Sequence, residues 1–398
     1  MTARILQVIR RADRPLSKKD VALASQVSLS SVSEHLDRLM NANLIVKSSI
    51  GQSSGGRKPR LYAFNPDAGY LVSIDMDTEN AKVAITDFDC NIKAHSNCLI
   101  DINDGPEKVL DRIKEAVFEL LAELRLDPDA VKGIGVGIPG PVEFASGMPI
   151  SPTIMPGWDR YPIKEYWARY FNCPSYIDND VNIMALGEYA KGLKFQANNV
   201  IYIKTAAGIG AGIICDGNLY RGSNGSAGDI GHFDVGGDVI CWCGNRGCLE
   251  ASAGGKAIVA KARESALAGK SEFLLGILEK KGELHLEDIA LGMQRQDSLC
   301  AELIRESSVL IGRVIASIVN FFNPELILVG ASYSEFDDTL LAAIRQGVYQ
   351  RSLPLSTRNL SIQKSILGNQ AGLIGAAYMT LEQLILNSIN DQEDVAIL

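Results

Sequence analysis

Three cysteines within eight consecutive positions constrain this chain more than any other feature of its sequence. They are Cys241, Cys243 and Cys248, and His232 lies shortly upstream. Thiolate and imidazole groups are the ligands that zinc prefers, and four of them complete a tetrahedral structural site. Two glycines between the second and third cysteines permit the tight turn that would bring the thiols together. The spacing predicts a structural Zn²⁺ held by these four residues, with unrelated buried thiols or a disulfide as the alternatives.

Two carboxylates flank this cluster, Asp229 before it and Glu250 after it. Neither is suited to be a further ligand of a tetrahedral zinc ion that already has four. Both lie where a polar small molecule could be held. The same stretch therefore predicts a metal site and one wall of a binding site.

The length and composition of the chain favour a multidomain protein of a reducing compartment. A chain of 398 residues suggests two or three domains, and a hydrophobic content of 46% is ample for sizeable cores. There is no run of about 18 apolar residues that would predict a transmembrane helix, and residues 1–14 lack the apolar stretch of a signal peptide. Eight cysteines, three of them clustered, indicate metal binding more than a disulfide framework. We expect a cytoplasmic protein with no membrane partner.

Charge is distributed unevenly along the chain. Residues 1–64 contain 11 Lys or Arg against 4 Asp or Glu, a net charge of +7, although the whole chain has a net charge of −8. The remainder of the chain is therefore strongly acidic. A basic segment on an acidic body indicates contact with nucleic acid at one end, although a short basic segment can also be a solvated face.

The first 42 residues have the pattern of three short helices. Apolar residues at helical spacing predict helices over residues 3–11, 18–25 and 31–42, and Ser17 and Ser30 are suitable N-caps for the second and third. Two helices joined by a short turn, with polar side chains facing outward on the second, form a helix-turn-helix whose second helix enters the major groove. The side chains that we expect to contact DNA from this helix are Ser31, Ser33, His35 and Arg38.

A basic loop between two predicted strands follows the third helix. The strands span residues 44–49 and 60–64, and the loop between them is rich in glycine. Arg57, Lys58 and Arg60 supply positive charge beside a proline that keeps the backbone extended. Such a wing can place arginine in a narrow minor groove or against phosphates. A flexible, solvated loop is the alternative, and its position behind a helix-turn-helix favours DNA contact.

Beyond residues 65–69 the pattern changes to that of an α/β protein. Three strands over residues 70–75, 81–87 and 92–99 precede an amphipathic helix at 106–124 and a strand at 131–138. A second set of strands at 200–205, 210–215 and 326–329 accompanies a long helix at 298–322. Two similar α/β lobes usually leave a ligand-binding cleft between them. We expect a winged helix-turn-helix over residues 1–66, a first lobe over 67–190 and a second over 191–398, with the last helix packing back on the first lobe.

Four stretches together resemble the ROK family, which comprises bacterial sugar kinases and related transcriptional repressors. The stretch Cys-x-Cys-Gly-x-x-Gly-Cys-x-Glu at 241–250, preceded by Gly-Asp-Ile-Gly-His at 228–232, is similar to the family signature. The segments at 135–142, 178–182 and 371–377 resemble the family's Gly-x-Gly-x-Pro-Gly-Pro, Asn-Asp-x-Asn and C-terminal helix motifs. The resemblance covers residues 70–385 and implies an actin-like, hexokinase-type fold with two ribonuclease H-like lobes.

The resemblance also implies roles for single residues. Asn179 and Asp180 match the pair that binds sugar hydroxyls, the aspartate being the general base of the kinases. Asp229, where the family usually has Glu, and Glu250 match further sugar-side residues, and His232 matches a residue that ligates zinc and contacts sugar. Gly140, in the Pro-Gly-Pro segment, and Trp158, in the loop after it, complete the expected sugar-binding set. For Trp158, a place in the hydrophobic core is an equal alternative.

The nucleotide side of the same resemblance is eroded. The kinases carry Asp-x-Gly-Gly-Thr in their first strand pair, where this chain has Asp75-Met76-Asp77-Thr78-Glu79. Both glycines are absent, and two further carboxylates would repel a triphosphate. Ala206 and Ala207 replace the leading Gly and Thr of the second hairpin, and the adenosine-side Gly-Gly has become Gly330-Ala331.

These observations predict a sugar-responsive transcriptional regulator that is not an enzyme. Its partners would be operator DNA and a sugar effector, and its two-fold operator would be bound by a homodimer or homotetramer. A residual sugar kinase, or a repressor controlled by a protein partner, are the alternatives. Family habit alone favours repression over activation.

Overall fold

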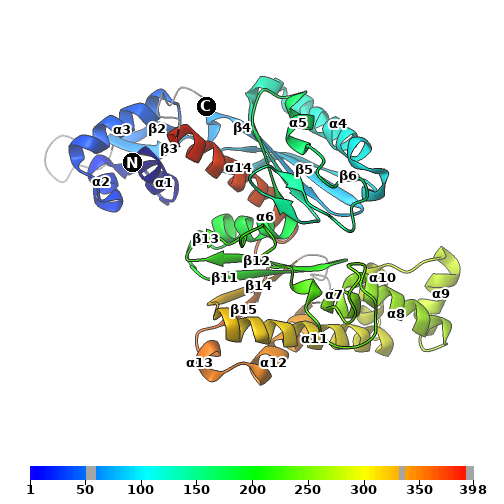
Figure 1. The fold of residues 1–398 in the computed structure, drawn as a ribbon. Coiled ribbons are helices and arrows are strands. Elements are labelled where there is room, and N and C mark those ends of the chain that lie inside the picture. Colours follow the sequence, from blue (N-terminus) through cyan, green and yellow to red (C-terminus); the bar gives the residue numbers. More distant parts are fainter. Residues whose placement is uncertain (51–59, 331–336, 391–398) are drawn as a thin grey trace.

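The computed structural model describes residues 1–50, 60–330 and 337–390, which form a small N-terminal head followed by two α/β lobes (Figure 1). Arg57 and Lys58, which we expect in the basic wing, lie outside these ranges. No helix within the described ranges is long and apolar enough to cross a membrane.

The head, residues 1–50 and 60–64, packs three helices against a three-stranded antiparallel sheet of order β1-β3-β2. Its elements are α1 (Thr2–Arg10), β1 (Leu16–Ser17), α2 (Lys18–Ser25), α3 (Leu29–Asn41), β2 (Ile45–Ile50) and β3 (Arg60–Phe64). The predicted apolar faces of the three helices meet in one core. Its buried side chains are Ile5, Leu6, Ile9, Val21, Val32, Leu36 and Leu39.

The N-cap predicted for α2 is confirmed, and the one predicted for α3 is wrong. The hydroxyl of Ser17 accepts a hydrogen bond from the backbone N–H of Asp20 at 3.3 Å, as predicted for the start of α2. The cap of α3 is Ser28 and not Ser30, so the helix begins two residues earlier than expected. Ser28 has the extended backbone that an N-cap requires, and its hydroxyl accepts from the N–H of Ser31 at 3.3 Å.

The two lobes repeat one topology. The first sheet has the order β10-β7-β4-β5-β6 and the second has the order β13-β12-β11-β14-β15. In each sheet the first strand of the lobe pairs antiparallel with the next strand and parallel with a later one, β4 with β5 and β7, and β11 with β12 and β14. The repeated α/β unit predicted from the sequence is therefore present as two mixed sheets.

The strands of both lobes are short and mostly buried. In the first lobe they are β4 (Tyr70–Met76), β5 (Asn80–Asp87), β6 (Ile92–Leu99), β7 (Val131–Ile138), β8 (Val142–Glu143), β9 (Met148–Pro149) and β10 (Ser175–Asn179). In the second lobe they are β11 (Val200–Thr205), β12 (Ile209–Cys215), β13 (Asn218–Leu219), β14 (Leu326–Gly330) and β15 (Ser361–Lys364).

Helices cover the sheets and join the lobes. The first lobe has α4 (Pro106–Leu124) and α5 (Ile163–Ala168). The second has α7 (Leu249–Ala253), α8 (Gly255–Leu267), α9 (Glu272–Lys281), α10 (Leu286–Gln294), α11 (Ser298–Phe322), α12 (Asp337–Arg351) and α13 (Pro354–Thr357). Helix α6 (Asp180–Gly187) lies between the lobes, and α14 (Ala371–Asn390) runs along the first lobe from α6 to the head (Figure 1).

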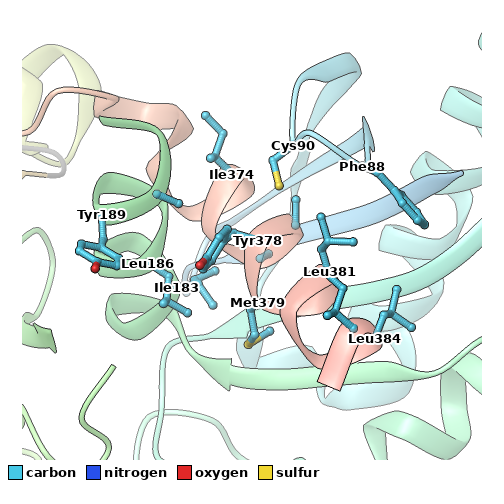
Figure 2. Packing of buried hydrophobic residues seen from close by; sticks show 14 of the residues in the cluster. Phe88, Cys90, Ile183, Leu186, Tyr189, Ile374, Tyr378, Met379, Leu381 and Leu384 are labelled. Atoms are coloured by element: carbon cyan, nitrogen blue, oxygen red, sulfur yellow. The ribbon is translucent and has the colours of Figure 1, made fainter. Parts of the chain in front are cut away.

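Helices α6 and α14 cross at very short range. A Cβ atom placed on Gly375 of α14 would lie 1.6 Å from the carbonyl oxygen of Ile183, and one placed on Gly187 of α6 would lie 2.1 Å from the carbonyl oxygen of Ala371. Figure 2 shows Ile183 and Leu186 of α6 beside Tyr378 of α14. Glycine at these two positions is what permits the close crossing.

The head is attached to the distal part of α14. The Arg10 guanidinium, at the end of α1, donates to the carboxylate of Glu382 at 2.5 Å and lies 4.8 Å from the ring centroid of Tyr378. The side chain of Arg10 is only 8% exposed. The next residue, Arg11, lies 4.3 Å from the ring centroid of Phe195. The head is therefore in contact with α14, the helix that crosses α6.

Candidate functional site

A pocket of about 260 Å³ lies between the two lobes. The end of β10, the start of α6 and the segment after β7 contribute to it from one side. The β11–β12 hairpin and residues 225–250 contribute from the other. Of the seven residues that the sequence assigned to a sugar, the pocket lining contains Gly140, Asn179, Asp180, Asp229, His232 and Glu250.

Asn179 and Asp180 stand at the junction between β10 and α6. The side-chain oxygen of Asn179 accepts from the N–H of Val181 at 2.9 Å, which caps α6, and its amide donates to the carbonyl oxygen of Gly140 at 3.0 Å. One carboxylate oxygen of Asp180 also accepts from the N–H of Val181, at 2.8 Å. Capping thus fixes both side chains at the N-terminal end of a helix, in the pocket wall.

A second layer of polar contacts supports this junction. Asp178 is buried, and one of its oxygens accepts from the side-chain amide of Asn182 at 2.8 Å. Its other oxygen forms an ion pair with Arg221 at 2.8 Å. The sequence placed Asp178 in the motif but gave it no partner, because Arg221 is 43 residues further along the chain.

A buried lysine in the pocket was missed by the sequence reasoning. Lys204, on β11, is 7% exposed, and its ammonium nitrogen lies 2.5 Å from the carboxylate of Asp180 and 3.9 Å from that of Asp77. Burial lowers the pKa of Lys204, but Asp180 and Asp77 together raise it by more, so the lysine is charged. The only signal in the sequence is a lysine directly after the apolar run of residues 200–203, within a predicted strand.

Glu250 closes the opposite wall at the start of α7. One of its carboxylate oxygens accepts from the backbone N–H of Ile209 at 2.7 Å, and the other accepts from the indole N–H of Trp242 at 2.5 Å. The rings of His232 and Trp242 meet edge to face with centroids 4.9 Å apart. Asp229, three residues before His232, is partly buried, and burial raises its pKa. The two carboxylates that flank the cysteine cluster therefore both line the pocket.

The predicted metal ligands converge. His232, Cys241, Cys243 and Cys248 bring their ligand atoms within 4.8 Å of one another. The sulfur atoms of Cys243 and Cys248 are 3.7 Å apart, and the sulfur of Cys241 is 3.8 Å from Nδ1 of His232. A disulfide needs a separation of about 2.05 Å, whereas two thiolates on one tetrahedral ion with bonds of about 2.3 Å lie close to 3.8 Å apart. The four side chains therefore fit a tetrahedral metal ion.

The loop that carries these ligands turns through glycines in the left-handed region. Gly244 has a φ of 91° and Gly247 a φ of 72°, so the turn predicted between the second and third cysteines is present. A β-bridge joins Asp234 to Cys248 and another joins Ile240 to Arg246. The chain thus folds into a compact knuckle beside the pocket.

Trp158 lies elsewhere. Its side chain is fully buried in the core of the first lobe, and its indole N–H donates to the carbonyl oxygen of Ile102 at 3.3 Å. Thr153 and Ile154, from the same loop, do line the pocket. The placement of Trp158 agrees with its interpretation as a core residue and leaves no ring face for a sugar in the pocket.

Those of the expected DNA-contacting residues that the structure describes are at least partly exposed. Ser31 and Ser33 are partly exposed on α3, and Arg38 is exposed and paired with Glu34 at 2.6 Å. Arg60 is exposed at the start of β3. His35 is less free, because its ring nitrogen Nδ1 lies within hydrogen-bond distance, 2.9 Å, of the hydroxyl of Thr2. Burial and then the charge of Arg38 lower the pKa of His35.

Known repressors resemble almost the whole of this chain, whereas known kinases resemble a smaller part of it. The sequence pattern of the ROK family matches residues 71–383. A xylose repressor of Caldicellulosiruptor bescii is 29% identical over 372 residues, which are 93% of this chain and 92% of that protein. A glucokinase of Halalkalibacterium halodurans is 33% identical over 282 residues, which are 70% of this chain and 85% of the enzyme.

Solved structures show the same division. A ROK family transcriptional regulator, described as a homologue of the Escherichia coli Mlc protein, superimposes with a TM-score of 0.83 at 25% identity and covers 98% of this chain and 96% of its own. A ROK family glucokinase from Streptomyces griseus, in complex with glucose and AMPPNP, has a TM-score of 0.71 at 26% identity. The glucokinase is covered completely but accounts for only 79% of this chain.

Proposed function

The chain belongs to the ROK family, and from this we propose that it is a DNA-binding transcriptional regulator whose affinity for its operator is set by a sugar bound between the lobes. The observation that carries the proposal is the extent of the similarity. Named repressors and a regulator structure match more than nine tenths of this chain, including the head, whereas the kinases match the body. The names of the relatives favour repression.

The nucleotide side supports a regulator over a kinase. Asp77 and Thr78 stand in the β4–β5 turn at the positions where the kinases have glycines for phosphate contact, and Glu79 follows them. The carboxylate of Asp180, the position of the kinases' general base, is already paired with an ammonium group at 2.5 Å. An ammonium partner stabilises the ionised carboxylate and so makes it a weaker proton acceptor. The pairing and the loss of both glycines oppose phosphoryl transfer, and we infer that the chain is not an enzyme.

We assign the head to operator binding as a winged helix-turn-helix. Helix α3 would enter the major groove with Ser31, Ser33, His35 and Arg38, of which Arg38 is exposed and the other three are partly exposed. Arg57, Lys58 and Arg60 would contact phosphates or the minor groove. Because operators of this kind are two-fold symmetric, we expect a homodimer or homotetramer, acting in the cytoplasm where the DNA is.

We assign the interlobe pocket to the sugar. Carboxylates and amides accept from and donate to vicinal hydroxyls, and Asn179, Asp180, Asp229 and Glu250 present such groups from both lobes. Sugar bound by both lobes would favour one relative arrangement of them. The head, fixed to α14 through Arg10, would change position with that arrangement.

We propose Zn²⁺ as the metal of the knuckle formed by His232, Cys241, Cys243 and Cys248. The donor set of three thiols and one imidazole is typical of a structural zinc site, in which all four positions are taken by protein. Bound there, the ion supplies rigidity and no catalytic step. His232 belongs to both the metal cluster and the pocket lining, so the knuckle would hold one wall of the sugar site in shape.

Two assays on the purified full chain test this proposal. The first selects duplexes from a random library and measures their release by sugars, and we expect at least one sugar to lower DNA affinity. The second is an ATP-coupled phosphorylation assay over the same sugars, and we expect no turnover. Turnover near 1 per second, which is within the usual range of enzymes, would establish a kinase instead. Failure to select any duplex would remove the DNA-binding role.

A further inference from the structure

Among the described residues that line the pocket, Lys204 is a buried lysine to which the proposed function gives no role. It projects from β11 of the second lobe and reaches Asp180, the first residue of α6, at 2.5 Å. It also approaches Asp77, in the turn after β4 of the first lobe, at 3.9 Å. One side chain of the second lobe therefore contacts carboxylates from two other elements at the floor of the pocket.

Both members of the ion pair between Lys204 and Asp180 are buried. The side chain of Lys204 is 9% exposed and that of Asp180 is 4% exposed. A buried charge is costly unless a partner and hydrogen bonds compensate it. If Lys204 or Asp180 paired with another group instead, the charge of the one left behind would be buried without compensation. Asp77 is less buried, with its side chain 39% exposed, and the charge of Lys204 is the largest cause that lowers its pKa.

The surrounding charges leave the pocket with an excess of carboxylates. Those in its lining are Asp77, Asp180, Asp229 and Glu250, against the ammonium groups of Lys204 and Lys256. Behind the lining, Asp75 of β4 is paired with Lys82 of β5 at 3.9 Å. Lys204, the buried cation among the described lining residues, is thus already neutralised. The other charged groups of the lining, Asp77, Asp229, Glu250 and Lys256, have a net negative charge.

We propose that Lys204 is a resident cation whose charge Asp180 and Asp77 already compensate, so that the effector is an uncharged sugar and neither a sugar phosphate nor a nucleotide. The inference rests on the proposed function, whose sugar it narrows to one chemical class. An uncharged sugar can exchange hydrogen bonds with Asn179 and Asp180 while the ion pair persists. A phosphate group would compete with Asp77 and Asp180 for Lys204 and would meet the remaining carboxylates at short range.

Matched pairs of ligands test this inference by calorimetry on the full chain. The probes are glucose, mannose, galactose and xylose, each beside its terminal phosphate ester. We expect the wild-type chain to bind the unphosphorylated member of a pair at least about tenfold more tightly, since one uncompensated charge contact at short range is worth that much. Equal or tighter binding of the phosphate ester would overturn the inference and leave the sugar-responsive function intact. If no member of any pair binds, the proposed function itself fails.

Three variants test the residue. Asp77→Asn removes one carboxylate from Lys204, and we expect it to narrow the preference for the unphosphorylated sugar about threefold or more. Lys204→Met should weaken binding of that sugar while Lys204→Arg retains most of it. Lys281→Met, which removes another lysine from an ion pair in the second lobe at 2.7 Å from Asp288, is the control and should change neither affinity. Thermal melting establishes that each variant is folded, and an unchanged preference in a folded Asp77→Asn chain would contradict the role of the pair.

Discussion

Substituting Gly375 by alanine tests the close crossing of α6 and α14. The added Cβ atom would lie 1.6 Å from the carbonyl oxygen of Ile183, 2.5 Å from its carbonyl carbon and 2.9 Å from the nitrogen of Gly187. All three contacts are with backbone, so no side-chain rotation relieves them. The two helices would have to separate.

The size of the effect follows from these distances. A carbon–oxygen contact is ordinarily above about 3.2 Å, so relief requires a separation of roughly 1.5 Å along a crossing that is otherwise close-packed. Overpacking of a core usually costs about 1–3 kcal/mol and sometimes more. Alanine recovers only about 1 kcal/mol through its higher helix propensity. We expect Gly375→Ala to lower the free energy of unfolding by about 3 kcal/mol.

A matched substitution separates packing from propensity. Gly276 lies in α9, and a Cβ atom there would meet nothing within 4 Å. Gly276→Ala should therefore raise the stability by up to about 1 kcal/mol. Urea unfolding of both variants and the wild type, followed by circular dichroism, gives the comparison. If Gly375→Ala were as stable as Gly276→Ala, the helices would not be packed as described.

Three further predictions concern the pocket and the knuckle. Burial raises the pKa of Asp75 to about 6, so the free energy of unfolding that its protonated form contributes is full below about pH 4 and is lost as the pH rises through 6. Asp75→Asn should reduce the fall in unfolding free energy between pH 4 and pH 7, measured by urea titration, by up to about 3 kcal/mol. If the variant shows the same fall as the wild type, another group takes up the proton. Purified chain should contain one zinc ion per subunit by metal analysis, and Cys243→Ser or a chelator should lower the melting temperature and abolish the sugar response; zinc-free protein with a normal response would contradict the proposed role of the metal. Asp180→Asn should keep DNA affinity but require at least about tenfold more sugar for release in a fluorescence-anisotropy titration, and release at the wild-type sugar concentration would rule out its contact with the sugar.

Local sequence patterns predicted much of this fold. The helices of the head and the repeated strands appear because their apolar residues recur at the periods of helices and strands. The knuckle is also local, since its three cysteines and two glycines lie within one turn. The start of α3 was misplaced because Ser28 and Ser30 both carry a suitable hydroxyl, and only the backbone conformation distinguishes them.

Contacts between distant segments could not be predicted in the same way. Lys204 looked like one lysine in an apolar strand, and its partners Asp180 and Asp77 lie in other elements. Trp158 is the opposite case, a residue that the sequence assigned to the sugar but that the pocket lining does not contain. An aromatic ring in a loop near the pocket can be either a ligand contact or part of the core. Its hydrogen bond to Ile102, 56 positions earlier in the sequence, places it in the core.

The most direct test of the account is the affinity of the full chain for a selected operator duplex, measured by fluorescence anisotropy with and without saturating uncharged sugar at one salt concentration. We predict that one such sugar lowers the affinity at least about tenfold, which corresponds to a coupling free energy of about 1.4 kcal/mol. The same titration with Asp180→Asn should show little of this loss. Operator affinity that no sugar changes, in a chain that binds the sugar by calorimetry, would contradict the claim that the pocket controls the head.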